Sequence, residues 1–433
     1  MAVRKASDTP TAQVTTEPNA RSAEVRAVRR MQLLTLLAVM GPGLIAGLSD
    51  DDPAGITTYS VLGARFGYQL LWVLVVSTVA LVLFQDLGAR IGVVTGQGII
   101  GLVRQRYGAR SAGVAIVALV LANAGTTTAE FAGTAAAAEL FGISRYVAVP
   151  VAAVVVCVLV LHGQFKGVQR IFLVLSAGFA AYIIAGVLAH PDWLAAARGS
   201  VVPSMPVTRD AIVIATATLG TTLAPWGLAF IQSYAVDKQL TTKDLPYLRI
   251  DVVTGAILTG VIGFFVVVAC AATLHPLGIH INDAAQAAQA LEPLAGHLAA
   301  KLFAIGLVGA AMLAASILPL STSYAVADLT GRPAALDDPI RDAPLFYATF
   351  VLITAIGAGL VLIPGIPLIP VLVLTQVLNA ILLLPILAFM YGLSRDRSLM
   401  GPYRATRTAA GSYLVTIVLI TLCIAALGIA SIR

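Results

Sequence analysis

The order of apolar and polar residues along the chain predicts its secondary structure directly. Continuous apolar runs of about 20 residues, which suit helices that cross a bilayer, recur from Met31 to the C-terminus. They predict about eleven spans, at residues 31–62, 70–93, 112–141, 146–161, 171–188, 211–234, 250–274, 297–326, 345–363, 368–393 and 412–432. Because apolar and polar residues do not alternate in these runs, a transmembrane β-barrel is excluded. The expected fold class is an all-α polytopic membrane protein.

Two of the predicted spans are interrupted at comparable places. The first contains DDDPAG at 50–55, where aspartates adjoin the helix breaker Pro53, and the sixth contains GTTLAPWG at 220–227. Interrupted spans at matching positions of two halves are typical of inverted-repeat transporters, which bind an ion at the breaks. We therefore expect a disordered cytoplasmic tail, two inverted repeats and one additional C-terminal span, at residues 1–23, 24–190, 208–394 and 408–433.

Composition and charge support a membrane protein. The chain is 59% hydrophobic and only 11% charged, which leaves too little polar surface to cover a soluble globule. The net charge of +6 comes from Lys and Arg in short loops, so it predicts orientation in a lipid bilayer and no nucleic-acid partner. The basic loops alternate along the chain, which predicts a cytoplasmic N-terminus and an outside C-terminus in the cell (inner) membrane. The pattern leaves the oligomeric state open.

The sequence contains no motif that indicates catalysis. It has no phosphate-binding glycine loop, no nucleophile with an ordered His and Asp, and no redox motif, so we expect neither an enzyme nor a cofactor. Cys157, Cys270 and Cys423 lie within apolar runs and predict no disulfide framework.

Asp50, Asp51 and Asp52 are the strongest candidates for a functional site. A solvated acidic turn would explain three aspartates in a loop, but apolar helix flanks them closely on both sides. Carboxylates within a membrane span are costly and usually functional, and hard divalent cations prefer oxygen ligands. We therefore predict a cation site in which Asp52, beside the Pro53 break, is a direct ligand.

Polar residues of three other spans are candidates for the same site. The break of the sixth span offers hydroxyl and carbonyl oxygens at Thr221 and Ala224, although Pro225 is also compatible with an ordinary kink. Glu130 of the third span is either a silent protonated carboxyl or a group that carries protons along an aqueous path. Gln376 of the tenth span is a candidate to face the ion path.

Several motifs, in matching order, resemble one family of transporters. GPGLIAGLSDDDPAG at 41–55 is similar to a first-span motif that ends in DPGN, and it is followed by ARIGVVTGQG, TAEFAGTAAAAELFGI, LEPLAGHLAAKLFAIGLVGAA and TQVLNAILLLP. On these motifs the chain resembles the NRAMP family of divalent metal transporters over most of its length. The resemblance implies a leucine-transporter-type fold, with two inverted five-helix repeats, an eleventh helix, and a metal site between broken helices 1 and 6.

The metal-site positions of that family are only partly retained. Asp52 matches the motif aspartate, whereas Gly55 stands where the family has Asn and Ala224 where it has Met. Loss of the thioether, which favours soft transition metals, suggests a harder ion that keeps some of its waters. The chain in this respect resembles the NRAMP-related magnesium transporters, with Mg²⁺ favoured over Mn²⁺. The predicted metal-site positions are Asp51, Asp52, Gly55, Thr221, Ala224 and Gln376.

Positions that the family uses for proton movement also differ. Trp226 replaces its His, and Thr127 replaces an Asp three residues before Glu130. The segment 346–363 lacks the Arg residues that the family carries in its ninth span. The resemblance thus assigns Glu130, Thr127 and Trp226 to the ion pathway and predicts uptake without proton coupling.

Two other functions remain open from the sequence. A Na⁺- or H⁺-coupled carrier of a small organic solute would use Asp52 as its coupling or amine-binding group, with Gly55 and Trp226 shaping the pocket. A non-transporting sensor or a channel would show no saturable uptake, in contrast to a carrier. Fold analogy alone cannot choose among substrates.

Overall fold

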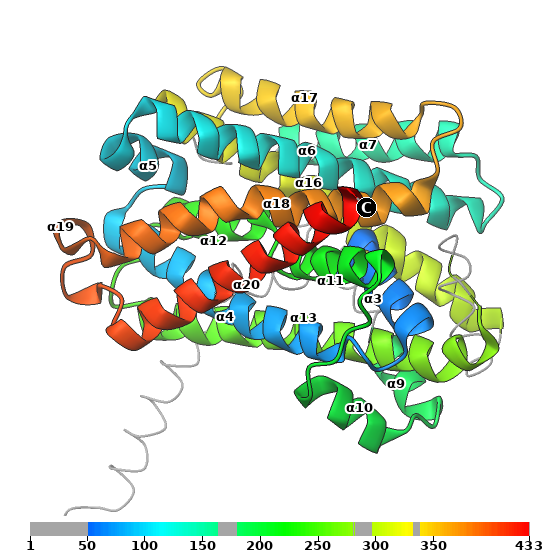
Figure 1. Cartoon of the computed structure of the whole chain (residues 1–433). Helices are drawn as coiled ribbons and strands as arrows, with labels where there is room; N and C mark the ends of the chain where they lie inside the picture. Colours follow the sequence, from blue (N-terminus) through cyan, green and yellow to red (C-terminus); the bar gives the residue numbers. More distant parts are fainter. Residues whose placement is uncertain (1–50, 163–179, 280, 282–296, 332–337, 433) are drawn as a thin grey trace, which may run out of the picture.

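The computed structural model describes residues 51–162, 180–279, 281, 297–331 and 338–432 (Figure 1). All regular elements in these ranges are helical, which confirms the expected all-α class. They are α3 (Pro53–Phe66), α4 (Leu71–Thr95), α5 (Ile99–Tyr107), α6 (Ala109–Glu139), α7 (Arg145–Leu161), α9 (Ala180–Leu188), α10 (Trp193–Val201), α11 (Arg209–Thr222), α12 (Pro225–Asp237), α13 (Leu245–Thr273), η2 (His275–Leu277), α16 (His297–Thr330), α17 (Pro344–Val361), α18 (Leu368–Arg395), α19 (Arg397–Met400), η3 (Gly401–Tyr403) and α20 (Arg407–Ile432).

The helices form two groups that α18 connects. In the first group α13 packs against α3 and α4, and α12 packs against α4. In the second group α6, α7, α16 and α17 pack against one another and form the upper layer in Figure 1. Helix α18 contacts both α6 and α11, while α20 lies across α11 and α18. Helices α3 and α12 of the first group also contact α6 of the second, so they lie where the two groups meet.

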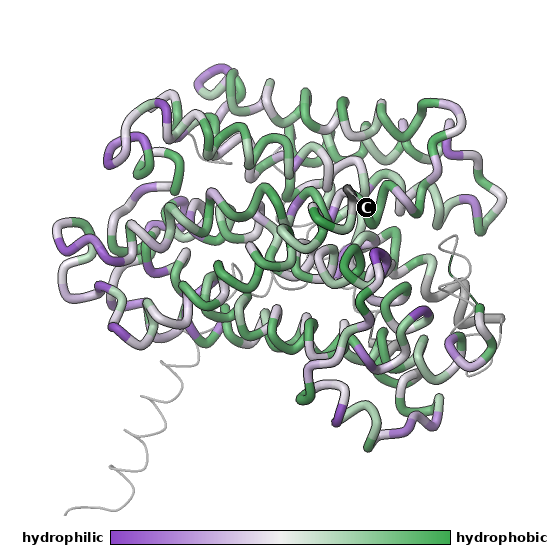
Figure 2. Tube along the Cα trace, viewed as in Figure 1, coloured by the Kyte–Doolittle hydropathy of each residue, from purple (hydrophilic) through white to green (hydrophobic). Residues whose placement is uncertain are grey.

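The predicted spans match the observed helices closely. In the described part of the chain, eight helical segments are long and apolar enough to cross a membrane, with the α11–α12 pair counted as one. Figure 2 shows hydrophilic residues concentrated in the turns at the ends of the bundle. Several boundaries shift by a few residues: α13 begins at Leu245 and α20 at Arg407, ahead of the predicted 250 and 412. In the first span, α3 begins at Pro53, so Gly55, which was expected in the break, lies inside this helix. The reason is that Pro is favoured in the first turn of a helix.

Some features lie outside the sequence prediction or outside the described residues. The short helices α5 and α10 were not predicted, because each is too short and too polar to give a membrane-spanning signal. The predicted tail 1–23, the first half of the first span and the beginning of the fifth span lie outside the described residues.

At one end of the bundle, which we call the arginine-rich end, two arginines of α5 contact segments that lie far away in the sequence. Arg104 of α5 donates to the Leu329 carbonyl at the end of α16, at 2.6 Å. Arg106 of α5 forms an ion pair with Asp396, which follows α18. We call the other end of the bundle the opposite end. It contains the turn between α3 and α4 and the short helix α10.

Candidate ion site between the two helix breaks

Asp52 is fixed at the start of α3. It is the N-cap residue of this helix, and its Oδ1 accepts a hydrogen bond from the Gly55 N–H at 2.6 Å. Pro53 follows at the first helical position, where its missing N–H leaves no lost helical bond. Only 3% of Asp52 is exposed. The sequence DPAG thus holds a carboxylate at the buried end of a half-helix.

Asp51 lies beside Asp52 and has no local partner. The residue is 1% exposed, and neither carboxylate oxygen has a hydrogen-bond partner among the described residues. Burying a carboxylate without a partner is very unfavourable, whereas a cation in the site would satisfy it. Asp50, the third aspartate of the predicted cluster, lies outside the described residues.

The second break exposes backbone acceptors. Helix α11 ends at Thr222 and α12 begins at Pro225, with Ala224 in the N-cap position and 4% exposed. Because proline has no N–H, the carbonyl of Thr221 lacks the helical donor that residue 225 would otherwise supply. The Thr221 hydroxyl is also buried and has no partner in the described ranges. At this break the carbonyl and hydroxyl oxygens of Thr221 are therefore both available to bind an ion.

Hydrogen bonds and apolar contacts hold the two breaks near each other. The hydroxyl groups of Tyr59 in α3 and Thr222 in α11 lie 2.9 Å apart, and Ser77 of α4 donates to Thr222 at 3.2 Å. Ala54 and Ala224, one from each break, belong to the same buried apolar cluster. Tyr59 and Ser77 were missed by the sequence analysis, since a single hydroxyl in an apolar helix gives no signal of its partner.

Glu130 of α6 reaches the first break. Gly133, one turn later on α6, packs directly on α3: a Cβ atom there would lie 2.1 Å from the Pro53 Cβ. The Glu130 carboxyl interacts electrostatically with that of Asp52. Glu130 is fully buried, and neither of its carboxyl oxygens is hydrogen-bonded in the described part of the molecule. Glycine at position 133 is what allows this close approach.

Gln376 lies beside the second break on α18. A Cβ atom at Gly220 of α11 would lie 1.9 Å from the Gln376 carbonyl oxygen, so the two backbones are in contact. The Gln376 Oε1 atom accepts from Asn379 at 2.9 Å, and Asn379 also donates to Thr126 of α6 at 2.8 Å. This chain of amides ties α18 to the helix that carries Glu130.

The remaining predicted pathway residues are buried. Thr127 packs against α17, where a Cβ atom at Gly357 would lie 2.7 Å from its Cγ2, and its hydroxyl has no partner among the residues described. Trp226 is 1% exposed, and its carbonyl accepts from Ser321 at 3.2 Å. It shares the apolar cluster of Ala54 and Ala224.

The candidate ligand atoms around the breaks are oxygens, and few of them belong to carboxylates. No group of three or more His, Cys, Asp or Glu side chains is arranged to hold a metal within the described ranges. A cation here would take its ligands from Asp51, Asp52, Thr221 carbonyl or hydroxyl oxygens, and water. Few protein ligands with retained water is the coordination typical of Mg²⁺, whereas closed carboxylate cages suit Ca²⁺.

The start of α3, packed beside the α11–α12 break within a bundle of apolar helices long enough to cross a membrane, belongs to a multi-pass membrane protein of the leucine-transporter fold. The family model described as natural resistance-associated macrophage protein-like matches residues 43–430, and the chain belongs to this NRAMP family. The expected family and fold are both confirmed.

Individual relatives agree with this assignment. A protein from Pectobacterium carotovorum subsp. carotovorum (strain PC1), described as divalent metal cation transporter MntH, is 29% identical over 392 residues, covering 88% of this chain and 91% of the relative. A crystal structure of the Eremococcus coleocola manganese transporter matches with a TM-score of 0.70 and 20% identity, covering 90% of this chain and 85% of that one. The structure of Mhp1, a nucleobase-cation-symport-1 family transporter, matches with a TM-score of 0.50 and 15% identity, covering 90% and 93%.

Proposed function

We propose that this protein is a secondary transporter that imports a divalent metal cation through a site between the breaks of α3 and of α11–α12. The observation that carries the proposal is the pair Asp51 and Asp52, which are buried at the first break while Asp51 has no partner among the described residues. The family supports a metal as cargo, since relatives are described as divalent metal cation and manganese transporters.

The proposed ligand set is made of hard oxygen donors. Asp52 is the direct carboxylate ligand, Asp51 adds negative charge, and Thr221 supplies carbonyl or hydroxyl oxygen. The backbone positions Gly55 and Ala224 and the amide of Gln376 line the remainder of the site. Ala224 offers no thioether, and oxygen donors with retained water favour Mg²⁺ over softer transition metals. The proposed order of preference is Mg²⁺ and then Mn²⁺.

Transport is proposed to proceed without proton coupling. Helix α17 presents Gly357 to Thr127, and its sequence from Pro344 to Val361 contains no Asp, Glu, His, Lys or Arg. Glu130 therefore has no proton-accepting partner on this side, and Trp226 cannot take up a proton. An inside-negative potential of about 100 mV would supply roughly 2.3 kcal/mol per charge, so about twice that for a divalent ion.

We propose that the arginine-rich end faces the cytoplasm. The ion path would open to the outside at the opposite end. There the outer parts of α3 and α11 are joined by the ion pair of Arg65 and Asp210 at 3.3 Å. A cavity of about 240 Å³ lies between these residues and α18, with Val61, Val213 and Val373 in its walls. Separating α3 from α11 at this pair and at the Tyr59–Thr222 hydrogen bond would connect the cavity to the breaks.

Ion flux into proteoliposomes tests the proposal. The purified protein is reconstituted with an ion-sensitive dye inside, and Mg²⁺ and Mn²⁺ entry are measured separately, with and without a pH gradient. We expect saturable Mg²⁺ entry that does not need acidification. Mn²⁺ entry accompanied by proton movement would contradict both the proposed ion preference and the lack of coupling.

A variant at the second break sharpens the same experiment. Ala224→Met returns a thioether to the site, so Mn²⁺ and Cd²⁺ should compete better against Mg²⁺ than in the wild type. Unchanged competition would show that residue 224 does not face the ion. Absence of flux for both Mg²⁺ and Mn²⁺ would favour the alternative, a Na⁺- or H⁺-coupled carrier of a small organic solute.

A further inference from the structure

A second cavity lies away from the ion site, at the opposite end of the bundle. Its volume is about 400 Å³. Its walls come from the last turn of α3, the turn into α4, helix α10 with the segment 202–204 that follows it, and η2. The lining residues are Phe66, Gly67, Tyr68, Gln69, Ala195, Arg198, Gly199, Val202, Ser204 and His275.

Direct contacts hold these walls together. Gly199 of α10 lies on the α3–α4 turn so closely that a Cβ atom would be 2.2 Å from the Tyr68 carbonyl oxygen. The Trp72 indole of α4 donates to the Ser204 carbonyl at 3.0 Å, which holds the segment 202–204 against α4. His275 Nδ1 donates to the Ala64 carbonyl of α3 at 3.0 Å. Packing and hydrogen bonds between its walls therefore define the shape of the cavity.

Arg198 supplies the positive charge of the cavity lining, and the Asp192 carboxylate at the start of α10 lies near Tyr68 of the opposite wall. Within the described part of the chain, the guanidinium group of Arg198 makes no ion pair or hydrogen bond, and no lining residue carries a carboxylate. Because His275 uses Nδ1 for the Ala64 carbonyl, its Nε2 is left on the side of Gly67. Gln69 and Ser204 add polar side chains to the lining. A cationic group that lacks a counter-charge favours an anionic ligand.

Helix α10 joins this cavity to an exposed apolar surface. Leu194 and Val201, at 81% and 78% exposure, lie one to two turns apart on the same face, and Arg198 lies between them. Trp193, 47% exposed, begins the helix. A short helix with exposed apolar residues, a Trp and an Arg at the end of a membrane bundle is typical of the lipid–water interface. The exposed apolar surface beside the cavity favours a lipid over a soluble anion.

We propose that this cavity binds the phosphate headgroup of an anionic phospholipid, with Arg198 at the phosphate and an acyl chain along Leu194 and Val201. The last turn of α3 forms one wall, so the bound lipid would contact the half-helix that begins at Asp52. The lipid site does not depend on the proposed metal transport, because its residues are separate from those at the breaks.

Ligand-dependent thermal stability of the full-length protein in a neutral detergent tests this site. Dioctanoyl phosphatidylglycerol, dioctanoyl phosphatidylcholine, glycerol 3-phosphate and inorganic phosphate are each titrated. We expect phosphatidylglycerol to raise the unfolding temperature most, with little response to glycerol 3-phosphate or phosphate. Arg198→Gln should weaken apparent phosphatidylglycerol binding by about five- to tenfold, the scale of one arginine at a lipid headgroup. Arg209→Gln, an exposed arginine at the same end but outside the cavity, is the matched control and should bind as the wild type does.

A second variant separates a lipid from a free anion. Leu194→Ser removes an exposed apolar side chain that no folded contact needs, and it should weaken phosphatidylglycerol binding while Arg198 is intact. Equal binding of phosphatidylglycerol by wild type and Arg198→Gln would overturn the site. A response to inorganic phosphate as strong as that to the lipid would overturn the lipid as its occupant. Neither result would bear on metal flux, which is measured independently.

Discussion

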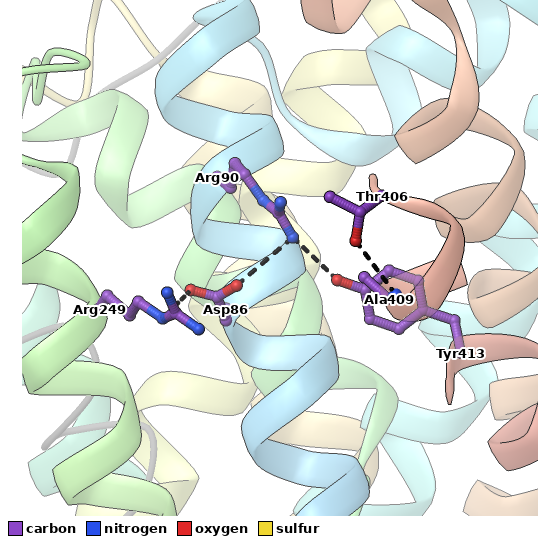
Figure 3. Close-up of polar contacts among 6 residues, drawn as sticks. All are labelled: Asp86, Arg90, Arg249, Thr406, Ala409 and Tyr413. Atoms are coloured by element: carbon purple, nitrogen blue, oxygen red, sulfur yellow. Dashed lines mark hydrogen bonds and ion pairs between the residues drawn. The ribbon is translucent and has the colours of Figure 1, made fainter. Parts of the chain in front are cut away.

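Asp51 and Asp86 are both aspartates of the helix bundle, and the structure gives them opposite surroundings. Asp86 of α4 accepts from Arg90 at 3.4 Å through one oxygen and forms an ion pair with Arg249 of α13 at 3.4 Å through the other (Figure 3). Arg90 in turn donates to the Tyr413 hydroxyl of α20 at 2.8 Å. Neither carboxylate oxygen of Asp51 has a partner among the described residues.

This difference indicates a structural role for the Asp86 carboxylate and a ligand-binding role for that of Asp51. At Asp86 the protein supplies its own cations, so the network joins α4, α13 and α20 without help from an ion. At Asp51, and at Glu130 of α6, the described residues supply none, although both are more deeply buried than Asp86. Buried carboxylates are tolerated when something pairs with them, and a transported cation is the partner that the proposed function provides.

The largest expected effect is at the first break. Asp52→Asn removes a charge from the proposed metal ligand but keeps an N-cap acceptor for α3, so the fold should persist. Metal uptake in proteoliposomes should fall by at least about tenfold, the scale of damaged metal coordination. Asp192→Asn is the matched control, because Asp192 is also an N-cap aspartate but is exposed on α10. Uptake near the wild-type level in Asp52→Asn would refute the ligand assignment.

A steric change should disturb the contact between Glu130 and Asp52 without altering a charge. Gly133→Ala places a methyl group against Pro53, which must move α3 away from α6. We expect reduced uptake together with a loss of stability of about 1–3 kcal/mol. Gly113→Ala on the same helix adds a methyl group into open space and should change neither measurement. Normal uptake in Gly133→Ala would mean that the α3–α6 contact does not position the site.

At the Asp86 network, stability should change more than transport. Asp86→Asn leaves two arginines without their carboxylate and should lower the stability by about 1–2 kcal/mol, since the group is partly exposed. Arg249→Gln, whose side chain is 71% exposed, should cost less than about 1 kcal/mol. Thermal unfolding in detergent measures both, and flux per folded molecule should stay close to that of wild type. Loss of flux at full stability would assign Asp86 to the transport cycle.

The smallest effect is expected from Asp396 at the arginine-rich end. Hydrogen bonds from Ser398, with the nearby Arg106, lower the pKa of Asp396 from its ordinary value of 3.8 to about 2. Because the pKa is lower in the folded protein, the stabilisation is present above pH 3.8 and is lost as the pH falls toward 2. The stability difference between wild type and Asp396→Asn should therefore be constant from about pH 8 to pH 5. A difference that changes within that range would show another titrating group.

Most of the helices, the start of α3 and the α11–α12 break could be predicted from the sequence. A bilayer requires apolar side chains and internally bonded backbone, so each span must appear as a continuous apolar run. Proline and aspartate interrupt such a run visibly, which is why Pro53 and Pro225 mark the breaks within a few residues. The ion pair of Asp86 and Arg90 was also predictable, because residues four apart on a helix are neighbours.

The membrane class, the spans and the α11–α12 break follow from the residues alone, because local chemistry along one helix sets them. Which groups meet depends on tertiary packing, as for Glu130 with Asp52, Tyr59 with Thr222, and Arg249 with Asp86. Such contacts depend on the rotation and spacing of whole helices. Glycines such as Gly133 and Gly220 set that spacing, yet in a sequence they resemble any other small residue of an apolar helix.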